Sequence, residues 1–165
     1  MRKALFLAVS VLVVSAPLAS AQHLGQNGLG VVNWEAPIGY ARGISDQTVL
    51  HLGLGYDHID SVSDTFTLFG QLNYDLIQHT GSHAGFGVAP SLMFQNESPD
   101  GGGDSTSGFR VGLALGGHWD PMDWVSFWLQ HGLYIEIISP PVGDSRTNFY
   151  ASGDLLGSAG FTFWF

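Results

Sequence analysis

Six titratable side chains fall on one face of the strands that the sequence predicts, where together they could form an ionic network: His51, Asp57, Asp75, Arg110, His118 and Glu136. Carboxylate and imidazole groups that meet away from water can act as a general acid and a general base. The same groups can also simply neutralise one another, because an unpaired buried charge is costly. We expect the structural role, a polar interior network without catalysis.

Other chemically suggestive motifs predict no site. His79 and His83 have metal-ligand spacing, but residues four apart share a face only on a helix, and Gly81 among polar neighbours predicts a turn. Gly103–Gly108 lacks the Lys-Ser/Thr pair of a phosphate-binding loop. Acidic residues of two loops could bind Ca²⁺ weakly, although they match no EF-hand: Asp57, Asp60, Asp64, Glu97, Asp100 and Asp104. We therefore expect no catalytic residue, cofactor or metal.

Alternation with a period of two residues dominates from residue 48 onward and predicts strands. One face is aliphatic and aromatic and carries no acidic residue, lysine or arginine in the central strands. The other face holds mostly Gly, Ala, Ser, Thr, Asn and Gln, which suit the cramped interior of a narrow barrel. His131 on the apolar face suggests a nearby bulge, and Pro90 should weaken its ladder. Eight strands are expected near 25–33, 36–44, 48–57, 65–76, 84–95, 108–119, 124–138 and 153–165.

The connections between these strands alternate in length. Short turns are expected at 45–47, 77–83 and 120–123, and longer loops at 58–64, 95–107 and 139–147. In membrane barrels the periplasmic turns are short and the outer loops long. The alternation therefore predicts an up-and-down order of strands, with the end of the chain on the short-turn side.

The two ends of the chain carry export and assembly features. Residues 1–21 combine a positive start, an apolar run and Ala19-Ser20-Ala21, which predicts a cleaved secretory signal peptide and leaves 22–165 as the mature domain. At the other end, Phe161, Phe163 and Phe165 alternate with other residues up to the terminus. An exposed aromatic edge strand would invite aggregation unless it pairs with another strand, as it would in a closed barrel.

Composition excludes several classes of function. The chain has no cysteine, so disulfides and thiol chemistry are absent. Beyond residue 21 it has three arginines and no lysine against fourteen acidic residues, a net charge of −11, which argues against nucleic acid as a partner. No mature segment reaches the apolar length of a transmembrane helix. If the chain spans a membrane, it must do so as a closed barrel.

Taken together, the signal peptide, alternating strands, turn-and-loop parity and terminal Phe165 resemble the small eight-stranded outer-membrane barrels of the OmpA, OmpX and OmpW kind. The segment 39–56 resembles a hairpin that such proteins often carry. The resemblance implies an all-β, closed antiparallel up-and-down transmembrane barrel, located in the outer membrane of a Gram-negative-type cell. It also implies outer-membrane lipid and the barrel-assembly machinery as partners, with the terminal phenylalanines as the assembly signal.

The expected function is structural or a surface interaction through acidic loops, with no enzymatic activity. One alternative is a lipid-modifying enzyme, because lipid A deacylases of this size resemble the chain in architecture. Those enzymes carry a His-x-Ser pair, and none of the seven histidines here is followed by serine at that spacing. The other alternative is a soluble secreted barrel that holds a small apolar ligand inside, which requires the aliphatic face to point inward.

Overall fold

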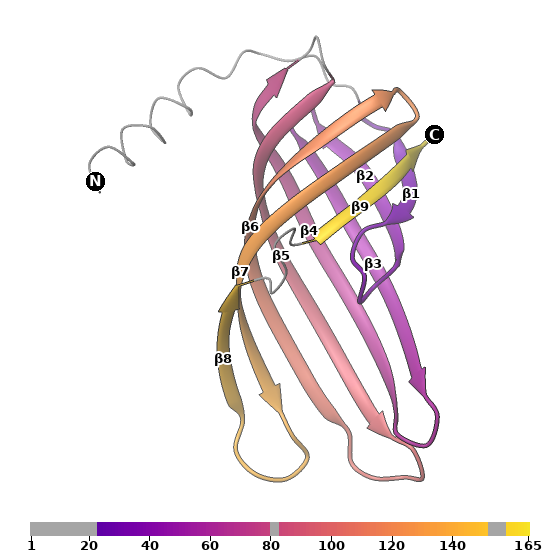
Figure 1. The fold of residues 1–165 in the computed structure, drawn as a ribbon, viewed down its shortest axis with the longest axis vertical. Helices are drawn as coiled ribbons and strands as arrows, with labels where there is room; N and C mark the ends of the chain where they lie inside the picture. Colours follow the sequence, from indigo (N-terminus) through magenta and orange to yellow (C-terminus); the bar gives the residue numbers. More distant parts are fainter. Residues whose placement is uncertain (1–22, 80–82, 152–157) are drawn as a thin grey trace, which may run out of the picture.

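The computed structural model describes residues 23–79, 83–151 and 158–165, and its regular structure there is entirely β (Figure 1). The expected signal peptide, residues 1–21, lies outside the described residues. No helix in the described part of the chain is long and apolar enough to cross a membrane.

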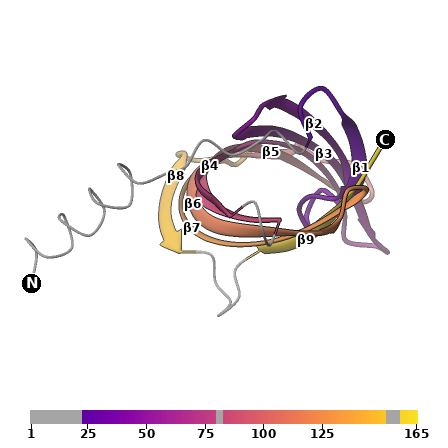
Figure 2. The ribbon, with the colours of Figure 1, turned by 90° about the horizontal axis from the view of Figure 1, so that it is seen from above.

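Nine strands make one antiparallel sheet. Their bounds are β1 (Asn27–Val31), β2 (Ile38–Ser45), β3 (Thr48–Ile59), β4 (Ser63–His79), β5 (Ala84–Pro99), β6 (Thr106–Met122), β7 (Val125–Ser139), β8 (Arg146–Ala151) and β9 (Ser158–Trp164). From β1 to β8 each strand pairs with the next, and β9 pairs with both β7 and β1. The sheet therefore closes into a ring, which Figure 2 shows from one end.

The last expected strand, 153–165, differs from the strands observed in this region. Both β8 and β9 pair with β7: β8 lies against Leu133–Ile138 and β9 against Val125–Gln130. Together they occupy the position of one strand beside β7, with residues 152–157 between them outside the described chain. Residues 146–151 were expected partly in a loop. They form a strand because they pair with Leu133–Ile138, the half of β7 nearer the hairpin end.

The two faces of the sheet are as predicted. On β6, for example, Leu113 and Leu115 are more than half exposed on the outside, whereas Ala114 between them is 1% exposed. The same alternation holds along β5 and β7. Small side chains fall inside because opposite walls of a narrow ring leave little space between them. The aliphatic face thus points away from the interior.

The two expected irregularities have different outcomes. His131 lies on the outer face in regular register with Leu115, so the bulge predicted beside it is wrong; one imidazole on an open face needs no change of register. The weakness at Pro90 is confirmed. On its β4 side, pairing steps from Gln71–Ser91 to Tyr74–Val88 and omits the proline, which has no N–H to donate.

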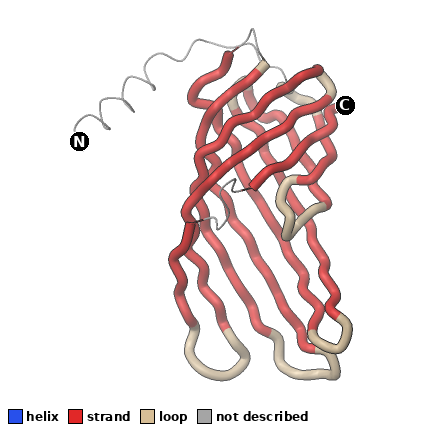
Figure 3. Tube along the Cα trace, in the orientation of Figure 1, coloured by secondary structure: helices blue, strands red, loops and turns tan. Residues whose placement is uncertain are grey.

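The ring has two different ends (Figure 3). At the short-turn end, β2 and β3 are joined by Asp46-Gln47, β6 and β7 by 123–124, and the chain terminus lies nearby. At the hairpin end lie the connections 60–62, 100–105 and 140–145. These are shorter than the predicted loops 58–64, 95–107 and 139–147, because β4 and β6 each continue to 17 residues and their partners extend with them.

The middle of the ring is filled by a plug, the packed side chains of Val32, Ala36, Phe69, Met93 and Trp128. The β1–β2 connection folds inward, so Val32 and Ala36 are fully buried and pack with Phe69, Met93 and Trp128. Beside this cluster, Gln71 Nε2 donates to Gln130 Oε1 at 2.7 Å across the interior, and Gln130 Nε2 donates back at 3.3 Å. In the strand register, the two glutamines lie level with β6 positions between Arg110 and His118. The plug therefore separates the surroundings of Arg110 from those of His118.

Candidate functional site

On the hairpin side of the plug, Arg110 of β6 holds two carboxylates. Its Nη2 donates to Glu136 Oε1 of β7 at 2.9 Å, and its Nη1 donates to Glu35 Oε2 at 2.7 Å. Arg110 and Glu136 are cross-strand neighbours, so these two members of the expected network lie together. Glu35 was missed, because it belongs to the inward-folded β1–β2 connection, where no periodicity shows which way a side chain points.

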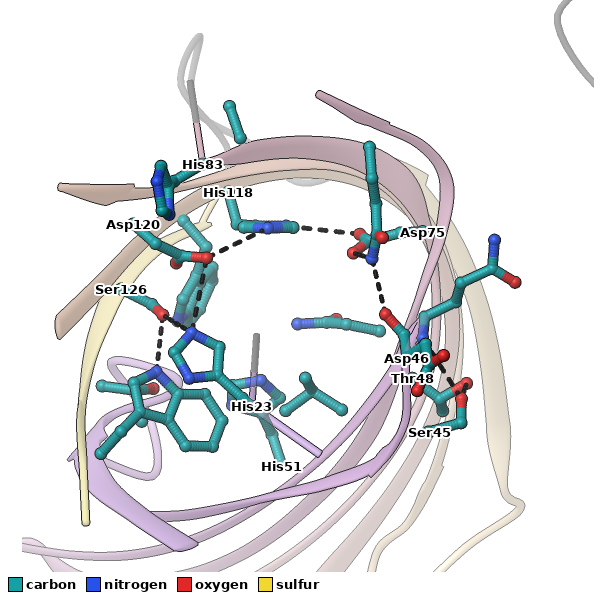
Figure 4. A pocket seen from close by; sticks show the side chains of 18 residues that line it. His23, Ser45, Asp46, Thr48, His51, Asp75, His83, His118, Asp120 and Ser126 are labelled. Carbon is teal, nitrogen blue, oxygen red and sulfur yellow. Dashed lines mark hydrogen bonds and ion pairs between the residues drawn. The ribbon is translucent and has the colours of Figure 1, made fainter. Parts of the chain in front are cut away.

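On the short-turn side, a chain of imidazoles and carboxylates crosses the ring (Figure 4). His118 Nδ1 lies 3.3 Å from Asp75 Oδ1, and His118 Nε2 lies 3.5 Å from Asp120 Oδ2. His23 Nε2 lies 3.4 Å from the same Asp120 oxygen. The structure therefore brings the predicted His118 and Asp75 together. Asp120 and His23 were not predicted as members of the network. Asp120 was assigned to a turn, and His23 precedes the first predicted strand.

The remaining two predicted members do not complete a single network. His51 is 3% exposed and faces Trp128 edge to face, with ring centroids 6.1 Å apart. Asp57 has the expected parity but is exposed near the hairpin end of β3, in neither cluster. β2 pairs with β3 only as far as Leu54, so Asp57 lies on a part of β3 that has no neighbouring strand on its β2 side. The interior polar residues form two clusters rather than one network.

A cavity of about 160 Å³ lies at the short-turn end and contains the His118 cluster. Its lining includes the turn residues Asp46 and His83 together with Trp128 and Trp164. Its carboxylates belong to Asp46, Asp75 and Asp120, and its lining residues include no lysine or arginine.

A third polar cluster lies outside the ring, at its hairpin end. Asp64 Oδ1 accepts hydrogen bonds from Tyr56 Oη and from His58 Nδ1, both at 2.7 Å, while His58 Nε2 lies 2.9 Å from Asp60. These contacts with Asp64 and then Asp60 raise the pKa of His58. Hydrogen bonds from Tyr56 and then His58 lower the pKa of Asp64. The cluster ties the tip of the β3–β4 hairpin together.

The same cluster touches the next hairpin. The Asp100 backbone N–H donates to the Val62 carbonyl at 3.0 Å, which joins the 100–105 loop to the 60–62 loop. Within the described ranges, His58, Asp64 and Asp100 are the group of three acidic or imidazole side chains whose ligand atoms all lie within 4.8 Å of one another. All three are at least partly open to solvent. The predicted loop carboxylates thus converge in part, with His58 as an unpredicted member.

Of the three predicted terminal phenylalanines, Phe161 and Phe163 lie in β9, where the ring closes, and Phe165 follows that strand with its backbone bonded to Asn27. Phe163 is exposed on the outer face and stacks on Trp124, with centroids 6.0 Å apart. Phe161 contacts Phe163 edge to face on the same strand. Their backbones pair with β1 on one side and β7 on the other, so this stretch is not an open edge.

Comparisons with known proteins give no assignment: no family model, no curated protein and no solved structure matches the chain. Its function must therefore be inferred from the geometry of its own residues.

Proposed function

We propose that the chain is an integral outer-membrane β-barrel protein of a Gram-negative-type cell, with a structural or surface-interaction role. The observation that carries this proposal is the apolar outer face of a closed ring. Along β6 and β7 the outward positions from 109 to 119 and from 127 to 137 hold aliphatic or aromatic residues, one glycine and His131, with no acidic residue, lysine or arginine. Soluble monomers rarely expose contiguous apolar surface of this extent.

Aromatic residues near the short-turn end support the same proposal. Trp119 and Trp124 are each about half exposed, and both stack on outward phenylalanines, Phe127 and Phe163 respectively. Trp and Tyr concentrate where the hydrocarbon region of a membrane meets the headgroups. A girdle of this kind would mark the periplasmic interface and place the hairpin end outside the cell.

The plug favours an interaction role over conduction. Val32, Ala36 and Trp128 pack inside the ring together with the Gln71–Gln130 pair, so side chains occupy its middle. The hairpin end instead presents acidic side chains, including those of Asp60 and Asp100, on long paired strands. Exposed loops on a rigid sheet are a common location for binding surfaces.

Fractionation and electrophoresis test this proposal. We expect the mature protein in the outer-membrane fraction, resistant to a carbonate wash, with a mobility in detergent electrophoresis that changes on boiling. A compact barrel resists unfolding by detergent at room temperature, whereas heat opens it. A water-soluble periplasmic protein without such a mobility change would contradict the proposal.

The lipid-modifying alternative keeps a direct test of its own. Lipid A extracted from cells with and without the protein should have the same mass if the chain is not an enzyme. The soluble ligand-binding alternative has little to support it, because its aliphatic face would have to point inward. In the structure those side chains point outward, and the interior is lined largely by polar and small residues.

A further inference from the structure

The cavity at the short-turn end is lined by buried polar atoms that have no hydrogen-bond partner among the described residues. Six lining residues each carry one such atom: His51 Nδ1, Asn73 Oδ1, Gln78 Oε1, Asp120 Oδ1, Trp128 Nε1 and Thr162 Oγ1. Asp120 and Thr162 are almost completely buried, at 2% and 0% exposed. Since nearly all buried polar groups in proteins have a partner, we expect an occupant of the cavity to supply these.

Most of these free atoms are hydrogen-bond acceptors. Gln78 Nε2 donates to the Asp46 backbone carbonyl and to Asp75 Oδ2, both at 2.8 Å, so the orientation of its amide is fixed and its free atom is the oxygen. An ionised Asp120 can only accept; its Oδ2 faces two imidazoles, whereas its buried Oδ1 has no partner in the described chain. An occupant that fits this lining must therefore be rich in donors.

The hydrogen bonds around His23 fit a neutral imidazole. Trp164 Nε1 donates to Ser126 Oγ at 2.6 Å, which leaves the Ser126 hydroxyl hydrogen to donate to His23 Nε2 at 3.3 Å. On the other side of the ring, His23 Nδ1 donates to Gln26 Oε1 at 2.8 Å. An imidazole that is protonated at Nδ1 alone satisfies both contacts. In this arrangement His23 supplies no positive charge to the neighbouring carboxylate of Asp120.

The charges around the cavity specify the sign of its occupant. The side chains of Asp75 and Asp120 are 15% and 1% exposed, and His118 lies between them, with ring nitrogens 3.3 Å and 3.5 Å from their oxygens (Figure 4). His118 can carry one positive charge for these two carboxylates. The described lining residues include no lysine or arginine and add a third carboxylate, that of Asp46. A cation would offset the cost of burying this excess negative charge.

We propose that this cavity binds a small organic cation of the guanidinium class, held by a charge-assisted hydrogen bond to Asp120 Oδ1. A guanidinium group has N–H donors on every nitrogen and no acceptor, which matches a lining of free acceptors around a carboxylate. The cavity of about 160 Å³ is several times the roughly 30 Å³ that one water occupies, so the group fits without movement of the lining side chains. The proposal concerns the interior of the ring and does not depend on what the hairpin end contacts.

The test is a titration of the refolded mature protein in detergent micelles, followed by the NMR shifts of its backbone amides. The probe is methylguanidinium, compared with methylurea, which keeps N–H donors but has no charge, and with tetramethylammonium, which keeps the charge but has no donor. We expect one methylguanidinium per chain, with the largest shifts around Asp120 and His118. Its affinity should exceed that of either comparison compound by at least about 10-fold, since both the charge and the donors contribute.

Asp120→Asn keeps the shape of the side chain but removes its charge, and it should weaken methylguanidinium binding by at least about 10-fold. The matched control is Asp64→Asn, which removes a carboxylate at the hairpin end and should leave the titration unchanged. Heat-dependent mobility shows whether each variant has folded, and Asp75→Asn, with the same expected loss, replaces Asp120→Asn if that variant has not. Failure of the folded native protein to bind methylguanidinium would mean that water alone fills the cavity and would overturn the proposal. Equal binding of methylurea, or equal losses in Asp120→Asn and Asp64→Asn, would overturn it too.

Discussion

Arg110 is the cation on which the interior carboxylates of the hairpin side depend. Its guanidinium is 17% exposed and its partner Glu136 is 14% exposed, so neither charge is well solvated. Glu35, the second partner, is 45% exposed and can reach water if the contact is lost. Loss of the Arg110–Glu136 pair should therefore cost more folding free energy than loss of the Arg110–Glu35 pair. A buried carboxylate without a partner is far more costly than an exposed one.

Arg110→Met should destabilise the folded protein by about 3 kcal/mol, because it leaves the Glu136 carboxylate buried without this partner. The urea midpoint of unfolding in detergent micelles measures the change. Glu35→Gln, the control on the exposed pair, should cost less than about 1 kcal/mol. The double change Arg110→Met with Glu136→Leu should recover most of the loss; equal midpoints for Arg110→Met and the native protein would refute this role of Arg110.

The His58 cluster predicts a pH window for the tip of the β3–β4 hairpin. The raised pKa of His58 gives stabilisation that is complete below its ordinary value of 6.5 and is lost as pH rises through the folded value. The lowered pKa of Asp64 gives stabilisation that is present above 3.8 and is lost as pH falls through its folded value. Protection of the amides at Ile59–Ser63, measured against their intrinsic exchange rate at each pH, should therefore be greatest between these limits.

His58→Asn is the matched variant for this window. It removes the imidazole charge, so the loss of protection above neutral pH should flatten while the acidic limit stays. An unchanged alkaline limb in this variant would show that the ion pair does not hold the hairpin tip.

At the scale of elements, closure of the ring depends on the short strand β1. Gly30 of β1 faces Thr162 of β9, and a Cβ at Gly30 would collide with the backbone carbonyl of Phe161. The strands can pair this closely because glycine has no side chain. A backbone carbonyl in a paired strand cannot move aside as the end of a long side chain can.

Gly30→Ala should therefore weaken the β1–β9 pairing and destabilise the ring by about 1–3 kcal/mol. Gly108→Ala on β6 is the control, since the nearest atom to its added Cβ would be Gln95 Cβ at 4.0 Å. The temperature at which the electrophoretic mobility changes is the readout. A lower temperature is expected for Gly30→Ala alone; equal shifts in both variants would contradict a specific role of β1 in closure.

The elements show why some features could be predicted from sequence and others could not. In β3 to β7 a period of two assigns each side chain to a face, so the outward position of Leu113 and the inward positions of Arg110 and Glu136 followed from alternation. Glu35 lies in a connection without a period, and its inward turn depends on packing of Val32 and Ala36 against distant strands. The continuation of β5 and β6 into the predicted loop 95–107 likewise depends on cross-strand partners, which local composition does not specify.

At the scale of the whole molecule, the chain inverts the usual arrangement of a globular protein. Its outer wall is apolar, its interior holds two polar clusters separated by a plug, and its hairpin end is acidic. A membrane would account for the outer wall, because hydrocarbon tolerates exposed leucine and phenylalanine and neighbouring strands satisfy each other's backbone groups where they pair. The central claim is therefore that the outer face of β6 meets lipid.

Site-directed fluorescence in lipid vesicles tests that claim most directly, and the absence of native cysteine allows single labels. Leu113→Cys places a label on the outer face of β6, where Leu113 is 57% exposed, and Asp104→Cys places one on the loop at the hairpin end. We expect brominated lipids to quench the label at 113 and aqueous iodide to quench the label at 104. Strong iodide quenching at 113, with no effect of brominated lipid, would show that the apolar face meets water and would contradict the claim.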